Sequence, residues 1–287
     1  MGDQVRATLW MCGWITAMLT MAVAGRELTD ADMSVFQIMV IRAGMGLMVT
    51  LPIIFFLGGK PAQTGLLKLH VLRNSIHFTA QYAWFVGISL IPLAQVVTIE
   101  FTMPIWTAIF AAMFIGEQIT RNRVLAIILG FIGVLVILRP GVEAIHWGAI
   151  VVMYAAAGFG ASVTMTRELA KADSALTIVF YMFLVQFIIG IGPALYQWVH
   201  ITSDMLPWAL LVAATGGSSH FFLAKAMRTA DATFVVTLDF LRVPLMAIIA
   251  WLLYSEPLEV WLFAGGVIIL VANLINLKKP ARVSAVE

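Results

Sequence analysis

Long apolar segments follow one another along the whole chain and are separated only by short polar stretches. A helix that spans a membrane needs about 20 successive apolar residues. The residues of these segments are continuously apolar and do not alternate between apolar and polar, which disfavours a membrane β-barrel. The pattern therefore predicts an all-α membrane protein with ten transmembrane helices. The predicted segments are 8–25, 35–57, 70–90, 93–115, 123–138, 147–165, 175–197, 207–226, 232–254 and 260–277.

Composition agrees with a polytopic membrane protein. Of the 287 residues, 62% are hydrophobic and only 11% are charged, whereas a soluble domain has about 25% charged residues. The net charge of +2 and the single Cys12 indicate neither a nucleic-acid partner nor a disulfide framework. No phosphate-binding glycine loop and no common hydrolase or metal motif is present. We therefore expect no catalytic residue, no metal and no cofactor.

The positions of Lys and Arg predict the orientation of the helices. With the N-terminus placed in the cytoplasm, thirteen of the seventeen Lys and Arg residues fall at cytoplasmic ends, Arg73 among them. Only Arg26 and Arg139 fall outside, while Arg42 and Arg242 lie within helices. Because cytoplasmic loops of membrane proteins are enriched in these residues, both termini are expected in the cytoplasm. The expected location is the inner (plasma) membrane of a bacterial cell.

The two halves of the chain repeat one another at an offset of 139 residues. The stretch Val96–Phe101 reads VVTIEF, and Val235–Phe240 reads VVTLDF. At the same offset, Glu117 matches Glu256. Ten helices divide into five and five, and an odd number per repeat inverts the second one in the membrane. We expect one five-helix repeat at 1–140 and a second, inverted one at 141–287.

Glu100 and Asp239 are the leading candidates for function, because an ionisable group inside a membrane is costly. They could bind a cationic group or a proton, one near each mouth of the protein. Alternatively they are structural, with Asp239 paired to Arg242 one turn further on. Nothing near Glu100 on its own helix offers a cation, so a solute cation or a proton is its expected partner. Pro104 and Pro244 follow the acids and predict either hinges or static kinks.

Other buried polar and aromatic residues are candidates for binding or coupling. Gln81 matches His220 at the repeat offset, and His77 lies one turn before Gln81. A histidine can relay protons, because its pKa lies near neutrality, or it can be a hydrogen-bonded packing group. Arg42 is interpreted mainly as a brace of the fold. One central cavity is expected to be lined by Trp14, Gln81, Trp106, Ser162 and His220.

Several short motifs resemble the EamA family of the drug/metabolite transporter superfamily. The matching residues are Phe36-x5-Arg42, Pro104 followed by Ile115-Gly116-Glu117, Gly130-x2-Gly133, and in the second half Val243-Pro244, Tyr254-Ser255-Glu256-Pro257 and Gly265-Gly266. Serine stands before Glu256 where the family usually has glycine, so the second half matches less well. The stretch from Gly216 to Thr233 is similar to the branch of S-adenosylmethionine uptake carriers. The resemblance implies ten helices around a central cavity, and transport of a small metabolite.

These observations favour a secondary-active transporter that works by alternating access. The solute is expected to be a small organic metabolite, with a cationic or cofactor-like compound such as S-adenosylmethionine as one candidate. Export of amino acids or other metabolites and uptake of a riboflavin-like vitamin remain open. A remote alternative is an intramembrane enzyme that uses Glu100, His77 and His220 as acid and base. Protons are a candidate coupling ion. The expected partners besides the solute are the lipids of the bilayer, and the protein is expected to be a monomer or homodimer.

Overall fold

The computed structural model describes residues 2–58, 62–118, 120–139 and 146–277, and this part of the chain is helical apart from short connections. The all-α prediction is therefore confirmed. The helices are α1 (Asp3–Asp30), α2 (Val35–Phe56), α3 (Leu67–Leu90), α4 (Leu93–Glu100), α5 (Met103–Ile115), α6 (Arg121–Leu138), α7 (Trp147–Leu169), α8 (Ala175–Tyr196), α9 (Leu206–Thr229), α10 (Ala232–Asp239), α11 (Arg242–Tyr254) and α12 (Val260–Leu277).

The helix bounds reproduce the internal repeat. The ends of α3, α4, α5 and α6 fall, residue for residue, 139 positions before those of α9, α10, α11 and α12. With α4–α5 and α10–α11 counted as one span each, the described chain holds two inverted repeats of five spans. Nine spans are long and apolar enough to cross a membrane, and the more polar α3, with 24 residues, is the tenth. The boundary expected between 140 and 141 lies outside the described residues.

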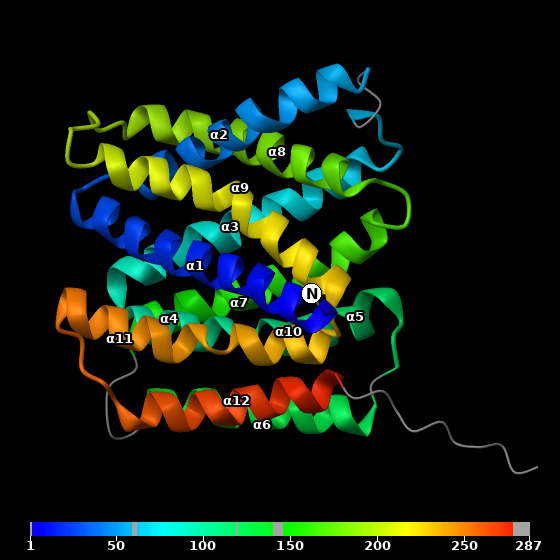
Figure 1. Ribbon diagram of the computed structural model, residues 1–287, viewed down its shortest axis with the longest axis vertical. Helices are drawn as coiled ribbons and strands as arrows, with labels where there is room; N and C mark the ends of the chain where they lie inside the picture. Colours follow the sequence, from blue (N-terminus) through cyan, green and yellow to red (C-terminus); the bar gives the residue numbers. More distant parts are fainter. Residues whose placement is uncertain (1, 59–61, 119, 140–145, 278–287) are drawn as a thin grey trace, which may run out of the picture.

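The two repeats are intertwined rather than side by side. The pairs that pack most extensively are α1 with α9, α3 with α7, α2 with α8, and α6 with α12, and each joins one repeat to the other. Figure 1 shows α2 and α8 at one edge of the molecule, α6 and α12 at the opposite edge, and the broken helices between α1 and that second edge. At Gly133 an added Cβ would come within 2.8 Å of the Gly265 carbonyl oxygen. Glycine there allows α6 and α12 to approach closely.

The segments predicted as single helices at 93–115 and 232–254 are each broken, which corrects that expectation. The breaks come directly after the two acids: α4 ends at Glu100 and α10 ends at Asp239. Hydropathy does not detect such a break, because the turn residues are themselves apolar or small. Asn273 of α12 donates to the Phe101 carbonyl at 2.9 Å, and Asn276 donates to the Pro104 carbonyl at 3.3 Å. Side chains of α12 thus satisfy carbonyl groups at the first break, as a membrane interior requires.

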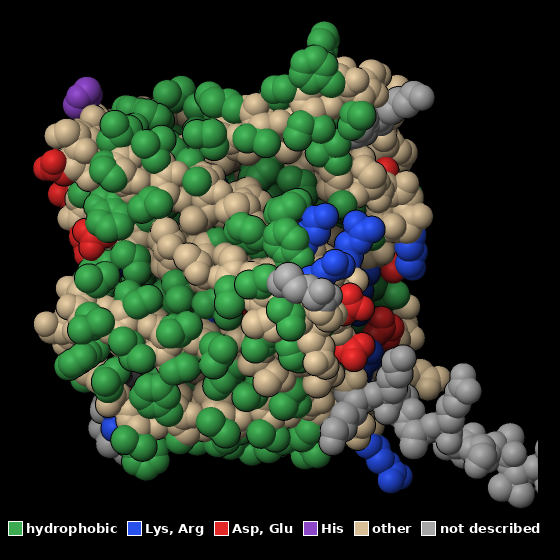
Figure 2. All heavy atoms as spheres, in the orientation of Figure 1, with side chains coloured by type: hydrophobic (Ala, Val, Ile, Leu, Met, Phe, Trp, Pro, Cys, Tyr) green, Lys and Arg blue, Asp and Glu red, His purple; other side chains and the backbone are tan. Residues whose placement is uncertain are grey.

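The first and last described residues lie at one end of the helical layers. The beginning of α1 and the end of α12 are on the same side in Figure 1, and Figure 2 shows Lys and Arg side chains gathered toward that side. We call it the inner end, because the sequence predicts that the termini are in the cytoplasm. Arg73 does not belong with these end charges, because it lies inside α3 and is only 7% exposed.

Candidate functional site

A guanidinium group joins the two acids at the centre of the molecule. Arg242 begins α11 and is buried, with 4% of its surface exposed. Its Nε donates to Asp239 Oδ1 at 2.6 Å and its Nη2 to Asp239 Oδ2 at 2.9 Å. Its Nη1 donates to Glu100 Oε1 at 3.1 Å. The expected Asp239–Arg242 pair is therefore confirmed, and Arg242 also bridges to the acid of the other repeat.

Two tryptophans complete this arrangement. Trp14 of α1 donates from Nε1 to Asp239 Oδ1 at 2.6 Å. Trp84 of α3 donates from Nε1 to Glu100 Oε2 at 2.8 Å. The Arg242 guanidinium also lies over the ring of Trp14, at 5.5 Å from its centroid, and over that of Phe101, at 4.8 Å. Each acid thus has one indole donor and shares one cation; we call Glu100, Asp239 and Arg242 the acidic cluster.

The acidic cluster corrects one expectation about Glu100. The cation that its own helix lacks is supplied by Arg242 of the second repeat, so a solute is not its sole available partner. With both carboxylates ionised, however, the cluster carries two negative charges and one positive charge. A buried excess of one negative charge is unfavourable unless something neutralises it. The geometry can therefore accept one proton or one cationic group beside Arg242.

A second set of buried polar side chains lies where α3 packs against its neighbours. The His77 Nδ1 lies 3.3 Å from the Ser162 hydroxyl of α7, and its ring packs against Phe159 with centroids 5.2 Å apart. Arg73, Arg42 and His220 are close enough to act electrostatically on His77. Gln81, one turn further along α3, is 4% exposed and its Oε1 has no hydrogen-bond partner in the described structure. The predicted site residues His77 of α3, Ser162 of α7 and His220 of α9 thus lie near one another.

Trp106 lies in an aromatic group. Its ring is 6.3 Å from that of Phe110 and 5.6 Å from that of Phe131, between centroids. Its buried Nε1 has no partner among the described residues.

The remaining predicted residues lie elsewhere. Arg42 donates to the Gln186 side chain at 3.3 Å, and Pro104 and Pro244 lie in the first turns of α5 and α11.

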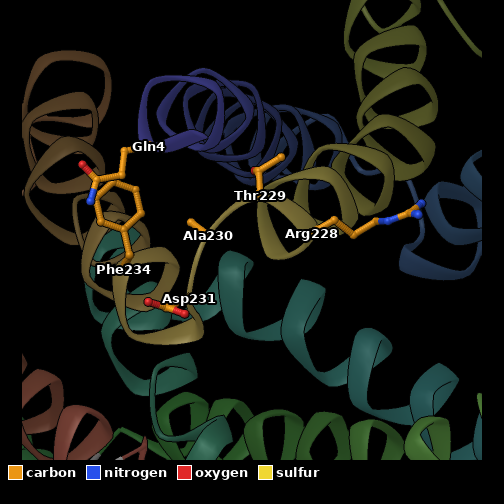
Figure 3. A pocket seen from close by; sticks show the side chains of 6 residues that line it. All are labelled: Gln4, Arg228, Thr229, Ala230, Asp231 and Phe234. Carbon is orange, nitrogen blue, oxygen red and sulfur yellow. The ribbon is translucent and has the colours of Figure 1, made fainter. Parts of the chain in front are cut away.

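Two pockets open elsewhere in the molecule, and neither is lined by the five residues expected around one cavity. The larger, of about 410 Å³, lies at the inner end, between the start of α1 and the link from α9 to α10 (Figure 3). It is lined by Gln4, Arg228, Thr229, Ala230, Asp231 and Phe234. The smaller, of about 260 Å³, is lined by Thr16, Leu19, Thr20, Val23, Trp208 and Ile249. The shared central cavity stays a prediction.

The two repeat-related glutamates make different contacts at opposite ends. Glu256 Oε2 accepts a hydrogen bond of 2.9 Å from the Leu93 N–H, at the start of α4, and its Oε1 is 4.0 Å from Arg26. Burial raises the pKa of Glu256, although the Leu93 N–H and Arg26 act in the opposite direction. Glu117 instead forms ion pairs with Arg123 at 2.6 Å and Arg167 at 3.4 Å. The Glu256 side is the outer end.

Comparison with known proteins gives the family. The model of the EamA-like transporter family matches twice, at residues 6–139 and at 146–277. The chain belongs to the EamA-like transporter family. The two matches coincide with the two sets of helices, so each repeat of this EamA-like chain is one family unit. A solved crystal structure with 15% identity and a TM-score of 0.65 covers 94% of this chain and 95% of its own, which supports the fold alone.

Several curated relatives are named as transporters. The S-adenosylmethionine uptake transporter of Rickettsia felis is 25% identical, over 96% of this EamA-like chain and 94% of the relative. The riboflavin transporter of Rhizobium johnstonii is 28% identical, over 83% and 80%. The pseudopaline exporter CntI of Pseudomonas aeruginosa is 28% identical, over 66% and 67%. The chain is thus a multi-pass membrane protein of a bacterial transporter family, and its relatives carry different small solutes.

Sequence reasoning did not find the contacts of four residues that shape the site. The bond from Trp84 to Glu100 depends on tertiary packing, which no local pattern shows. Asn273 and Asn276 are polar residues inside an apolar segment, which is the signal that could have marked them. Arg73 precedes His77 and Gln81 at a spacing of four residues each. That helical spacing could have placed it on the same face of α3.

Proposed function

We propose that the protein is a secondary-active transporter that moves a small organic metabolite across the membrane by alternating access. The observation that carries this proposal is the acidic cluster. It joins a carboxylate from each inverted repeat through one guanidinium, at the two places where spanning helices break. Broken helices and a site at the interface of inverted repeats are typical of secondary transporters.

The asymmetry between the two ends supports alternating access. At the outer end Glu256 bonds to the start of α4, and α11 packs against α4. By the repeat, Glu117 at the inner end would bond to the start of α10, but it pairs with Arg123 and Arg167 instead. The larger pocket opens at this inner end, beside Asp231 and Phe234. In the proposed cycle, this structure is the state that is closed at the outer end. When the Glu256 contact with α4 breaks and Glu117 forms the equivalent contact with α10, the outer end opens and the inner end closes.

S-adenosylmethionine or a similar cationic metabolite is our leading candidate solute. The unbalanced negative charge beside Arg242 favours a cationic group, and relatives over nearly the whole chain are named as S-adenosylmethionine uptake transporters. Uptake of a riboflavin-like vitamin and export of amino acids or other metabolites are second candidates, because relatives of comparable identity are named for riboflavin and pseudopaline. Catalysis is disfavoured, since the family and these relatives are transporters.

The remaining features of the proposal follow from the repeat and the charges. Both termini lie in the cytoplasm, the location is the bacterial inner membrane, and the repeats comprise 1–140 and 141–287. Glu100, Asp239, His77, Gln81, Ser162 and His220 take part in binding or coupling, with protons as the coupling ion, and Trp14 and Trp106 line the path. Arg42, Arg242, Pro104 and Pro244 support or articulate the site.

The first experiment is an untargeted comparison of solutes inside and outside cells that contain the wild-type protein, the Glu100→Gln variant or neither. A transporter should change the distribution of one solute class without altering its chemistry, and the variant should reduce that change. A new reaction product in place of redistribution would favour an enzyme and refute the proposal.

A further inference from the structure

Two buried arginines lack the acidic partners that Arg242 has. Arg42 is 3% exposed and Arg73 is 7% exposed. Arg42 contacts Gln186, and Arg73 donates to Thr166 at 3.1 Å and to Asn74 at 2.5 Å, which are all neutral groups. Within the described residues, no carboxylate forms an ion pair with either arginine. The Nε of Arg42 has no hydrogen-bond partner there at all.

Such an arrangement is costly unless something else neutralises it. A guanidinium remains protonated in proteins, and an unpaired buried charge costs several kcal/mol. Arg73 and His77, one turn apart on α3, contact Thr166 and Ser162, which are one turn apart on α7. Arg42 packs against Gly216, one turn before His220 on α9, and the four groups lie within electrostatic reach of one another. We call Arg42, Arg73, His77 and His220 the basic cluster. Its surplus of positive charge is suited to an anionic ligand.

One face of α3 connects the basic cluster to the acidic cluster. His77, Gln81 and Trp84 follow one another at spacings of four and three residues, which places them on the same side of a helix. His77 belongs to the basic cluster, and Trp84 donates to Glu100 of the acidic cluster. Seven residues of helix span about 10 Å. Between them, Gln81 presents a buried Oε1 with no partner in the described structure.

We propose that the basic cluster binds the anionic group of the transported solute, while the acidic cluster faces its cationic group. This inference rests on the proposed function and narrows it to zwitterions whose opposite charges lie up to about 10 Å apart. A carboxylate is the anionic group that matches a planar guanidinium best, because two parallel N–H donors can bind its two oxygens. The open Gln81 oxygen accepts a hydrogen bond from the same solute.

Arg73 is the better residue for a test of this site. At Gly216 of α9, an added Cβ would overlap the Arg42 side chain, so a change at Arg42 also disturbs how α2 packs on α9. Among the described residues, the Arg73 guanidinium donates to one hydroxyl and one amide group, and Arg73→Gln preserves polar character there. Arg73→Lys keeps the charge but loses the planar fork. Arg121→Gln is the matched control, since Arg121 is an exposed arginine at the start of α6.

The experiment measures how solutes shift the thermal stability of the purified protein in lipid nanodiscs. The probes are three pairs that differ in a free carboxylate: S-adenosylmethionine and its decarboxylated form, lysine and cadaverine, and methionine and its methyl ester. At least one carboxylate-bearing probe should stabilise the wild type, and its pair should not. Arg73→Gln should weaken that binding at least about tenfold, Arg73→Lys should restore part of it, and Arg121→Gln should leave it unchanged.

Three results would overturn the inference. One is equal stabilisation by probes that lack the carboxylate, and another is no stabilisation by any carboxylate-bearing probe. The third is a fall in the stability of ligand-free Arg73→Gln that accounts for its lost binding and is not reversed in Arg73→Lys, which would make Arg73 structural. Transport itself is scored separately in proteoliposomes. A protein that moves only solutes without an anionic group would defeat the basic-cluster site and leave the transporter proposal intact.

Discussion

Removing the cation from the acidic cluster should be the most damaging single change in the site. Arg242→Met keeps a side chain of similar reach but leaves Glu100 and Asp239 buried beside one another without their shared partner. Three charge-assisted hydrogen bonds, of 2.6, 2.9 and 3.1 Å, are lost. Breaking a buried ion pair by removing one member costs about 3–5 kcal/mol. We expect a decrease of that size in the free energy of unfolding.

Neutralising either acid should cost less, because the other acid still balances Arg242. Asp239→Asn loses the Oδ2 bond to Arg242 and removes the charge from the oxygen that accepts from Arg242 Nε and Trp14. Glu100→Gln loses one Arg242 bond and removes the charge from the oxygen that accepts from Trp84 alone. At about 1.5–3 kcal/mol for a hydrogen bond to a charged group, Asp239→Asn should be the less stable of the two. Because Glu100 also accepts from Arg242, Asp239→Asn does not leave Arg242 without an acidic partner.

The assay is thermal unfolding of each purified variant, followed by tryptophan fluorescence and by size-exclusion chromatography. Combining Arg242→Met with Glu100→Gln and Asp239→Asn removes all charge, and this triple variant should recover most of the lost stability. Arg167→Met serves as the control for a lost surface charge. Wild-type stability in Arg242→Met, or a triple variant no more stable than Arg242→Met, would refute the reasoning.

Three further predictions concern the ends of the molecule. Because burial raises the pKa of Glu256 from its ordinary value of 4.5, the stability it contributes is present below that value and is lost as the pH rises through its folded pKa. Glu256→Gln should flatten this part of a stability profile measured from about pH 4 to about pH 7, and an unchanged slope would count against it. Asp173 behaves oppositely: burial acts to raise its pKa, but hydrogen bonds from Thr64 and His70 outweigh this and lower it. The stability that Asp173 contributes is therefore present above the ordinary pKa of 3.8 and is lost as the pH falls through the folded pKa. At neutral pH, Asp173→Asn should lower the stability measured by thermal unfolding by about 1–3 kcal/mol. An unchanged stability would contradict the role of the hydrogen bonds from Thr64 and His70. In a Cys12→Ser background, a cysteine at Asp204 should react with an impermeant reagent from outside intact cells and one at Lys171 should not; the reverse result would invert the topology.

The sequence predicted the fold well, because burial in lipid leaves a strong hydropathy signal. The repeat offset of 139, read from VVTIEF and VVTLDF, also aligns the helix bounds. It did not predict the breaks after Glu100 and Asp239. Their turns are stabilised by groups far away in the chain, such as Asn273, which a local pattern cannot show.

The candidate site was predicted in part. Both acids were recognised because charge inside an apolar segment is conspicuous, and the Asp239–Arg242 pair followed from helical spacing. The Arg242–Glu100 bridge could not be predicted from sequence, because it joins two helices from different repeats and depends on how those helices pack. The burial of Arg73 could not be predicted either, because a count of Lys and Arg near helix ends does not separate buried side chains from exposed ones.

The most direct test of the central claim is transport by purified protein in liposomes, with the solute identified in cells and with S-adenosylmethionine. The wild type should accumulate solute in chemically unaltered form. Glu100→Gln should lose most of this uptake while it remains folded at the assay temperature, because Asp239 still balances Arg242 and the one lost bond costs only about 1.5–3 kcal/mol. Transport by Glu100→Gln at the wild-type rate from about pH 5.5 to about pH 8, or conversion of the solute by the wild type, would contradict the account.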